Sequence, residues 1–169
     1  MSMIAIFRRL PDADAARLSQ QPALLTDYID AEQPLAGFGE STEFDADKAW
    51  HAIHFLLTGT AWGGQPPLGF ILHGGTTLGS EDLGHGPARA FSAREVRVIA
   101  AALQALPSQS LGERFEPAAL AAAEIYPGIW HAPPGTDDPR GFVVEYYDAL
   151  RAFVLEAAQR GEAMLVYLS

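Results

Sequence analysis

The run Ala163-Met164-Leu165-Val166-Tyr167-Leu168 is apolar throughout and lies near the end of the chain. An uninterrupted apolar run of this length predicts a strand that is buried on both faces, at the centre of a sheet. Residues 3–8 form a second apolar run, which predicts another buried strand. Because mostly helical patterns lie between these strands, we expect a single domain over residues 1–169 of the α+β class. It should have a small mixed sheet that includes both terminal strands and is packed with about five helices.

Capping residues mark the helical segments between the two strands. Ser92 and Glu95 have the spacing of a capping box, in which each side chain bonds the backbone amide of the other residue. Pro107 is placed to end that helix. Asp138 followed by Pro139 is typical of an N-cap with proline at the first helical position. Further helical patterns begin at Pro11, at Pro22, at Asp45 as a possible N-cap, and at residue 117.

The segment from Thr60 to Pro87 has no such pattern. It is rich in glycine, proline, threonine and serine, apart from the apolar residues 68–72. A connection of this length without regular structure is uncommon in a compact domain. We therefore expect it to hold a functional loop or short irregular elements.

Composition excludes several classes of function. The 169 residues are 49% hydrophobic, which is enough for a sizeable core, and none is cysteine. The absence of cysteine excludes disulfides, thiolate nucleophiles and cysteine-based zinc or iron–sulfur sites. The formal net charge of −10 repels phosphate backbones and anionic lipid headgroups, so we expect no nucleic acid and no membrane as partners. The same charge favours basic proteins, cationic ligands or metal ions, or it serves only to keep the protein soluble.

The first residues do not have the features of a targeting segment. No basic region precedes the short apolar run, and the chain has no stretch of about 20 apolar residues. We therefore expect a cytoplasmic protein.

The segment from Trp50 to Gly59 places a tryptophan and two histidines in an otherwise apolar helix. Trp50 and His54 share one helical face, whereas His51 lies about 100° away, nearer to Asp47. Two histidines at this spacing could bind zinc if a third ligand came from elsewhere. We favour a hydrogen-bonded His54 in the core and an exposed His51 paired with Asp47. The other three histidines are His73, His85 and His131, and they show no compact ligand spacing. We therefore expect no metal and no cofactor.

A second candidate is Arg89, which follows the tight segment Gly84-His85-Gly86-Pro87. An arginine held in this way suits a carboxylate, a phosphate or a stacked aromatic ring. The segment lacks the Lys-Ser/Thr of a Walker loop and the third glycine of a dinucleotide loop. The alternative, a buried salt bridge from Arg89 to an acidic group, is the stronger interpretation.

The stretch from Glu124 to His131 holds two further candidates, Tyr126 and Trp130, beside a predicted turn. Their rings could line a pocket with the polar tips inward. They could equally fill the base of the core, which is the interpretation we favour.

Motifs for nucleophilic catalysis are missing from the sequence. There is no Gly-x-Ser-x-Gly, and Ser80 lacks the strand–turn–helix context of an exposed nucleophile. The acidic residues are numerous and scattered, so no pair can be assigned to acid–base chemistry.

Several of these segments together resemble the YfbM-like family of bacterial proteins, over nearly the whole chain. The likeness rests on the first four residues, the segment from Asp47 to Gly59, the segment from Gly84 to Arg89, Glu124-Ile125-Tyr126-Pro127 and the last strand. The resemblance implies a compact α+β fold, a bacterial cytosolic protein and no established cofactor, in a family of unknown function. Family motifs map onto Lys48, Trp50, His54, Thr58, Gly59, Gly86, Pro87, Arg89, Tyr126 and Pro127. His85 stands where the family is expected to have a tyrosine.

These observations favour a non-enzymatic domain that binds a small molecule or a basic protein partner. Its tentative ligand-binding residues are Trp50, His54, Arg89, Tyr126 and Trp130. The alternative is an enzyme that acts on an anionic small molecule, with His54 as acid–base and Arg89 as anion clamp. A third interpretation is a structural component of a homo-oligomer, in which the glycine-rich middle of the chain forms an interface.

Overall fold

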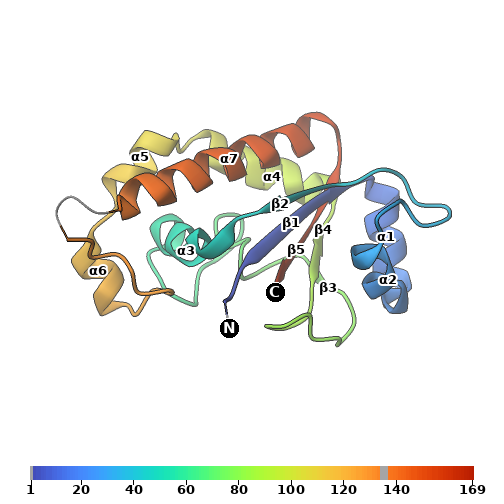
Figure 1. The fold of residues 1–169 in the computed structure, drawn as a ribbon. Coiled ribbons are helices and arrows are strands. Elements are labelled where there is room, and N and C mark those ends of the chain that lie inside the picture. Colours follow the sequence, from blue (N-terminus) through green and yellow to red (C-terminus); the bar gives the residue numbers. More distant parts are fainter. Residues whose placement is uncertain (1, 134–136) are drawn as a thin grey trace.

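Five strands form one sheet at the centre of the computed structural model, which describes residues 2–133 and 137–169. The strands are β1 (Ala5–Leu10), β2 (Thr42–Asp45), β3 (Thr76–Thr77), β4 (Arg89–Phe91) and β5 (Ala163–Leu168). Their order in the sheet is β2-β1-β5-β4-β3 (Figure 1). The α+β class and the presence of both terminal strands in one sheet are therefore confirmed.

The predicted position of β5 at the centre of the sheet is also confirmed. It pairs with β1 on one side, where Ala5 lies opposite Leu168, and with β4 on the other, where Arg89 lies opposite Val166. All four strand pairings in the described residues are antiparallel, whereas we expected a mixed sheet. An apolar run predicts burial on both faces but not the direction of the neighbouring strands, which only the path of the chain determines.

Helices cover both faces of the sheet. The α-helices are α1 (Asp12–Gln20), α2 (Leu25–Asp30), α3 (Trp50–Thr58), α4 (Ala93–Gln104), α5 (Ser108–Glu113), α6 (Pro117–Ala122) and α7 (Pro139–Gln159). Two short 3₁₀ helices are η1 (Pro22–Leu24) and η2 (Asp47–Ala49). The described residues thus form seven α-helices where about five were expected. The helix for which no pattern was found is α5 (SQSLGE), which has too few apolar residues to show a helical period.

The alternation of side chains along each strand divides the core between the two faces. Phe7, Phe91 and Val166 belong to the larger cluster, which includes residues of α3, α4 and α7. Leu165 and Tyr167 belong to a smaller cluster, which includes residues of α1 and α2. Figure 1 shows α4, α5 and α7 together on one side of the sheet and α1 and α2 at the other end. The molecule therefore has three layers.

The predicted helix ends are found with few changes. Ser92 Oγ accepts a hydrogen bond from Glu95 N at 3.2 Å, and Glu95 accepts one from Ser92 N at 2.7 Å. Asp138 caps α7 through Gly141 N at 3.0 Å. Asp45, expected as an N-cap, is the last residue of β2, and its carboxylate accepts a hydrogen bond from the backbone N–H of residue 47 instead.

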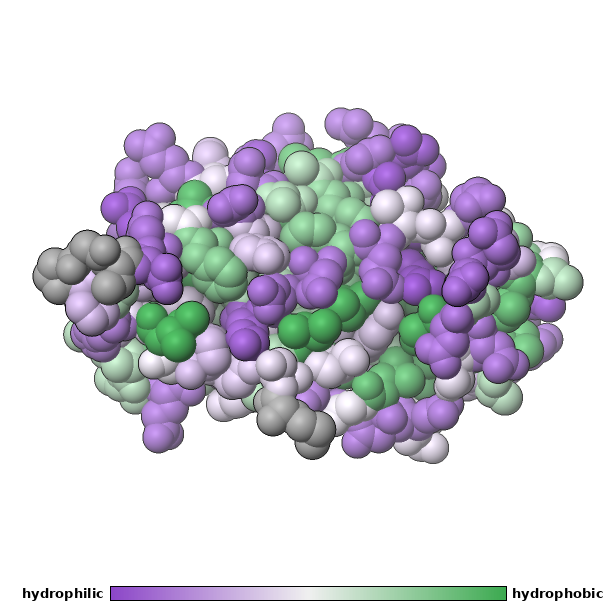
Figure 2. Space-filling model, in the orientation of Figure 1, coloured by the Kyte–Doolittle hydropathy of each residue, from purple (hydrophilic) through white to green (hydrophobic). Residues whose placement is uncertain are grey.

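On the face shown in Figure 2, hydrophilic side chains alternate with apolar patches. Among the residues that the structure describes, no helix has the length and apolar character that a membrane crossing requires.

Candidate functional site

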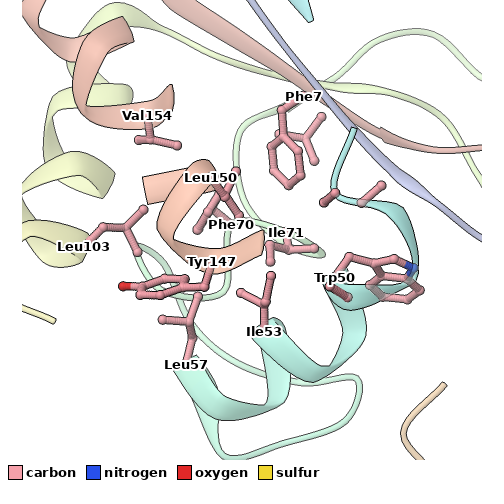
Figure 3. Close-up of a cluster of buried hydrophobic side chains, with 14 of the residues drawn as sticks. Phe7, Trp50, Ile53, Leu57, Phe70, Ile71, Leu103, Tyr147, Leu150 and Val154 are labelled. Atoms are coloured by element: carbon pink, nitrogen blue, oxygen red, sulfur yellow. The ribbon is translucent and has the colours of Figure 1, made fainter. Parts of the chain in front are cut away.

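Helix α3 carries most of the candidate residues, and the structure places them in the core. Seven of its nine residues are buried, so neither histidine faces solvent. Trp50 and His54 each have an exposed fraction of 0%. Figure 3 shows Trp50, Ile53 and Leu57 projecting from α3 into the larger core cluster. The helix ends at Gly59, whose φ of 77° is the left-handed conformation expected there.

Three histidines hold the loop that follows α3. The Nε2 atom of His51 is 2.8 Å from the carbonyl oxygen of residue 61, and that of His54 is 2.8 Å from the carbonyl oxygen of residue 63. The Nε2 atom of His73 is 2.6 Å from the carbonyl oxygen of residue 62, between them. Each of three consecutive carbonyls thus has its own imidazole. The histidines fix the path of the backbone over residues 61–63.

These contacts determine the protonation of the two buried rings. The Nδ1 atom of His51 accepts a hydrogen bond from Tyr126 N at 2.9 Å, so its proton is on Nε2, which donates to the loop. His54 also donates through Nε2, while its buried Nδ1 has no hydrogen-bond partner among the described residues. Burial lowers the pKa of His51, and it lowers the pKa of His54 to about 4. Both imidazoles are therefore neutral at neutral pH.

The expectation of an exposed His51 paired with Asp47 is wrong. The ring is completely buried and is held by backbone groups of two loops. Helical spacing alone does not show that the ring of His51 stacks on Trp50 or that a loop from residues 60–63 covers this side of the helix.

Aromatic rings stack around His51. Trp50 lies nearly parallel to it, with ring centroids 4.7 Å apart, and Trp62 packs on it at 4.3 Å. Tyr126 stacks near Trp50 at 6.3 Å, and its hydroxyl accepts a hydrogen bond from the backbone of Met3. Trp62 is 56% exposed, so it forms the outer surface of this stack. The structure therefore brings the buried Trp50 and the half-buried Tyr126 together.

Arg89 is held by the backbone of the same long loop. Its guanidinium donates to the carbonyl oxygens of Phe70, Ile71 and Gly74, and it lies over the Phe91 ring at 5.4 Å. Burial lowers its pKa to about 10, which leaves it charged at neutral pH. The expected salt bridge to an acidic group is not what is found, because three carbonyl oxygens supply the acceptors. A sequence pattern cannot predict such partners, since every residue has a carbonyl group.

Trp130 lies in a different part of the core. It is 1% exposed, its Nε1 donates to Ile125 O at 2.7 Å, and its ring meets Phe115 edge-on at 6.3 Å.

His54 and Arg89 lie near enough to each other that the positive charge of Arg89 contributes to the lowered pKa of the His54 imidazole. The side chains of His54 and Arg89 both bond to backbone carbonyls of the loop. They therefore hold in place the segment of residues 60–87, for which the sequence shows no regular pattern.

The outer part of that loop forms one wall of an apolar pocket of about 270 Å³, which we call the proline pocket. Its other wall is α4, and Phe91 of β4 contributes to it as well. Arg94 and Val98 of α4 are exposed, Val98 to 54%. The lining residues are Pro66, Pro67, Gly75, Phe91, Arg94, Glu95, Val98 and Ile99.

A close backbone contact holds the loop against β4 beside the proline pocket. A Cβ atom added to Gly75 would lie 2.6 Å from the carbonyl oxygen of Ala90, and the φ of Gly75 is +71°. Any other residue would push the loop away from the strand. The wall is therefore fixed by Gly75 at one point and by Arg89 at others.

Nothing in the sequence indicates the proline pocket as a site. Residues 60–87 are expected to hold a functional loop or short irregular elements, and a capping box is expected at Ser92, but no sequence pattern shows that these two segments meet. The contact between them depends on β3 and β4, which are too short for an alternating pattern to show. Over residues 2–133 and 137–169, no three histidine or acidic side chains are grouped as a metal site would require.

Comparison with known proteins agrees with this architecture. A family model described as a domain of unknown function, DUF1877, matches residues 1–167. The chain is similar to the solved structure of YfbM from Escherichia coli, itself described as a protein of unknown function. The two share 22% identity and a TM-score of 0.72, over 98% of this chain and 99% of that one. No functionally curated protein matches the chain. At this identity the structural likeness shows the fold alone.

Proposed function

Because the chain belongs to the DUF1877 family, whose function is unknown, we propose its function from its own geometry: a non-enzymatic binding domain for a small apolar carboxylate. The proline pocket is the proposed site. The observation that carries the proposal is a pocket with mainly apolar walls and one exposed arginine, Arg94, among its lining residues.

The size and chemistry of the proline pocket indicate the ligand. At about 270 Å³ it lies near the lower end of ligand pockets, so it suits one compact branched or aromatic group. Phe91, Val98 and the two prolines supply apolar contacts to such a group. The guanidinium of Arg94 suits a carboxylate because it can donate two parallel hydrogen bonds. Glu95 also lines the pocket, but its carboxylate is engaged by the Ser92 amide at 2.7 Å.

The loop that forms the wall of the proline pocket is held in place by other parts of the protein. A ligand would therefore meet a preformed site and not a flexible surface. The buried His54, the half-buried His73 and Arg89 hold carbonyls elsewhere in the loop whose outer part forms the wall. A wall fixed in this way loses little freedom when a ligand enters, and preorganisation increases affinity. The candidate residues of the sequence analysis thus support the site without touching the ligand.

The alternative is an enzyme with His54 as acid–base and Arg89 as anion clamp. Two observations favour binding over that alternative. His54 Nε2 donates to a loop carbonyl, and its pKa of about 4 leaves little imidazolium at neutral pH. The guanidinium of Arg89 already donates to three carbonyls.

Titration of ¹⁵N-labelled protein with phenylacetate tests the proposal, with phenylacetamide as the neutral control. We expect amide signals of residues 66–75 and 91–99 to shift in the millimolar range, with about tenfold weaker binding of the amide. Arg94→Gln should remove the preference for the acid, whereas Arg97→Gln, three residues further along α4, should not. If neither probe shifts these signals, the proline pocket is not a site for this class of ligand.

A further inference from the structure

Helix α4 borders a second hollow on the side away from the proline pocket, where it packs beside α7 (Figure 1). We call this hollow, of about 360 Å³, the α4–α7 groove. Its lining is apolar at Ala100 and Ala101 of α4 and at Leu155 and Ala158 of α7, and Arg97 also lines it. The proline pocket and the α4–α7 groove share no lining residue, so α4 separates them.

The spacing of residues on α4 places the two hollows on opposite sides of one ridge. Each residue turns the helix by about 100°, so Arg94, Val98 and Ala101 follow one another along its outer surface. All three are exposed. Ile99 lies on the side of the proline pocket, and Ala100 lies on the side of the α4–α7 groove. Because a helix with its side chains is about 10 Å across, a ligand must cross about this distance to fill both hollows.

The charge on this face is positive, although the chain has a net charge of −10. Arg94 and Arg97 are exposed, and neither belongs to an ion pair within residues 2–133 and 137–169. The carboxylate of Glu95 is already engaged in the capping box. The guanidinium of Arg89, which also has no ion pair in this part of the chain, lies 5.4 Å from the centroid of the Phe91 ring that lines the proline pocket. A negatively charged ligand is therefore attracted to this face of the molecule.

A small carboxylate in the proline pocket uses only part of this surface. The pocket holds one compact group, which leaves Arg97 and the α4–α7 groove without contact. A peptide in the polyproline II conformation rises about 3 Å per residue and makes one turn in three residues. Its side chains three positions apart therefore point the same way, about 9 Å from each other, and can enter both hollows at once.

We propose that this face binds the carboxyl-terminal end of an acidic polypeptide. The last side chain, which is apolar, enters the proline pocket, and an apolar side chain three residues earlier enters the α4–α7 groove. The terminal carboxylate pairs with Arg94, and acidic side chains between the two anchors face Arg97. This inference rests on the proposed function and names the source of the carboxylate that the proline pocket takes.

The test is titration of the ¹⁵N-labelled chain with the peptide acetyl-Leu-Asp-Asp-Phe, which has a free carboxylate. We expect it to shift amide signals of residues 66–75, 91–104 and 155–159 and to bind about tenfold more tightly than phenylacetate, because it adds a second anchor and two charges. Three control peptides each lack one feature: the carboxyl-terminal amide, the peptide with Asn for both Asp, and the peptide with Gly for Leu. Each should bind about three- to tenfold more weakly than the parent peptide.

Variants of the protein assign the charges. Arg97→Gln should reduce the affinity for the Asp peptide to about that for the Asn peptide, and it should leave phenylacetate binding unchanged. Arg140→Gln removes the same charge at an exposed position near the other end of α7, so it is the matched control and should bind like the original chain.

The outcomes separate this inference from the proposed function. If phenylacetate binds but the Asp peptide binds no more tightly, or if the Asn peptide binds equally well, the inference is refuted and the proline pocket remains a site for small carboxylates. If neither phenylacetate nor any peptide shifts these signals, both proposals fail. Signals of α4 that move with protein concentration, and not with peptide, would assign this face to a second copy of the chain and overturn the inference.

Discussion

Acidification should destabilise this protein through His54. The pKa of His54 is about 4 in the folded protein against an ordinary value of 6.5, because burial disfavours the charged ring. Between these values the unfolded chain binds more protons than the folded one, so the free energy of unfolding falls as the pH falls. The contribution of His54 is fully present above pH 6.5 and is lost progressively down to about pH 4. Between about pH 7 and pH 5 the loss is about 2 kcal/mol.

The structural reason is the unpartnered Nδ1 of His54. When the ring is protonated, Nδ1 gains a hydrogen with no acceptor, in a residue with an exposed fraction of 0%. His54→Gln keeps an N–H donor near the Gly63 carbonyl but does not titrate. At neutral pH the variant should have a lower free energy of unfolding than the original chain. Near pH 5 this difference should be smaller by about 2 kcal/mol, because the original chain has lost that amount through His54.

Urea denaturation at a series of pH values measures this difference. Acidic side chains contribute to both proteins, so the difference between the original chain and His54→Gln isolates the imidazole. His85→Gln, at an exposed histidine, is the control and should run parallel to the original chain. If the His54→Gln curve is also parallel between pH 7 and pH 5, the ring is not a buried neutral group, and the reasoning fails.

Three further predictions concern the loop and its neighbours. Arg89→Met should lower the free energy of unfolding, measured by urea denaturation, by about 3–5 kcal/mol, because it leaves buried carbonyls without a donor. The control Arg97→Met, at an exposed arginine, should lower it little, and equal losses in the two variants would contradict this account. Ser92→Ala removes the capping box and should cost about 1 kcal/mol by the same assay, while an unchanged midpoint would show that the cap contributes nothing. Acrylamide should quench mainly the fluorescence of Trp62, which is 56% exposed. Trp62→Phe should therefore abolish most of the quenching, and strong residual quenching would mean that the buried tryptophans are accessible.

Local sequence patterns predicted the helices and strands whose ends or burial depend only on residues close together in the chain. The apolar run of β5 predicted a central strand, and the capping box predicted the start of α4, because both depend on neighbours along the chain. The directions of the strands and the short strands β3 and β4 could not be predicted, because their pairing depends on distant segments.

For the candidate residues too, some properties follow from the local sequence and others from contacts with distant segments. The sequence by itself determined that Trp50 and His54 share an apolar helical face and that residues 60–87 are unusual, since composition and helical spacing are local properties. Only the tertiary structure decided what the polar groups contact. His51 and Arg89 bind backbone carbonyls, which every residue carries and no pattern marks. The proline pocket likewise exists only where a loop meets a distant helix and strand, so its position depends on how the chain packs.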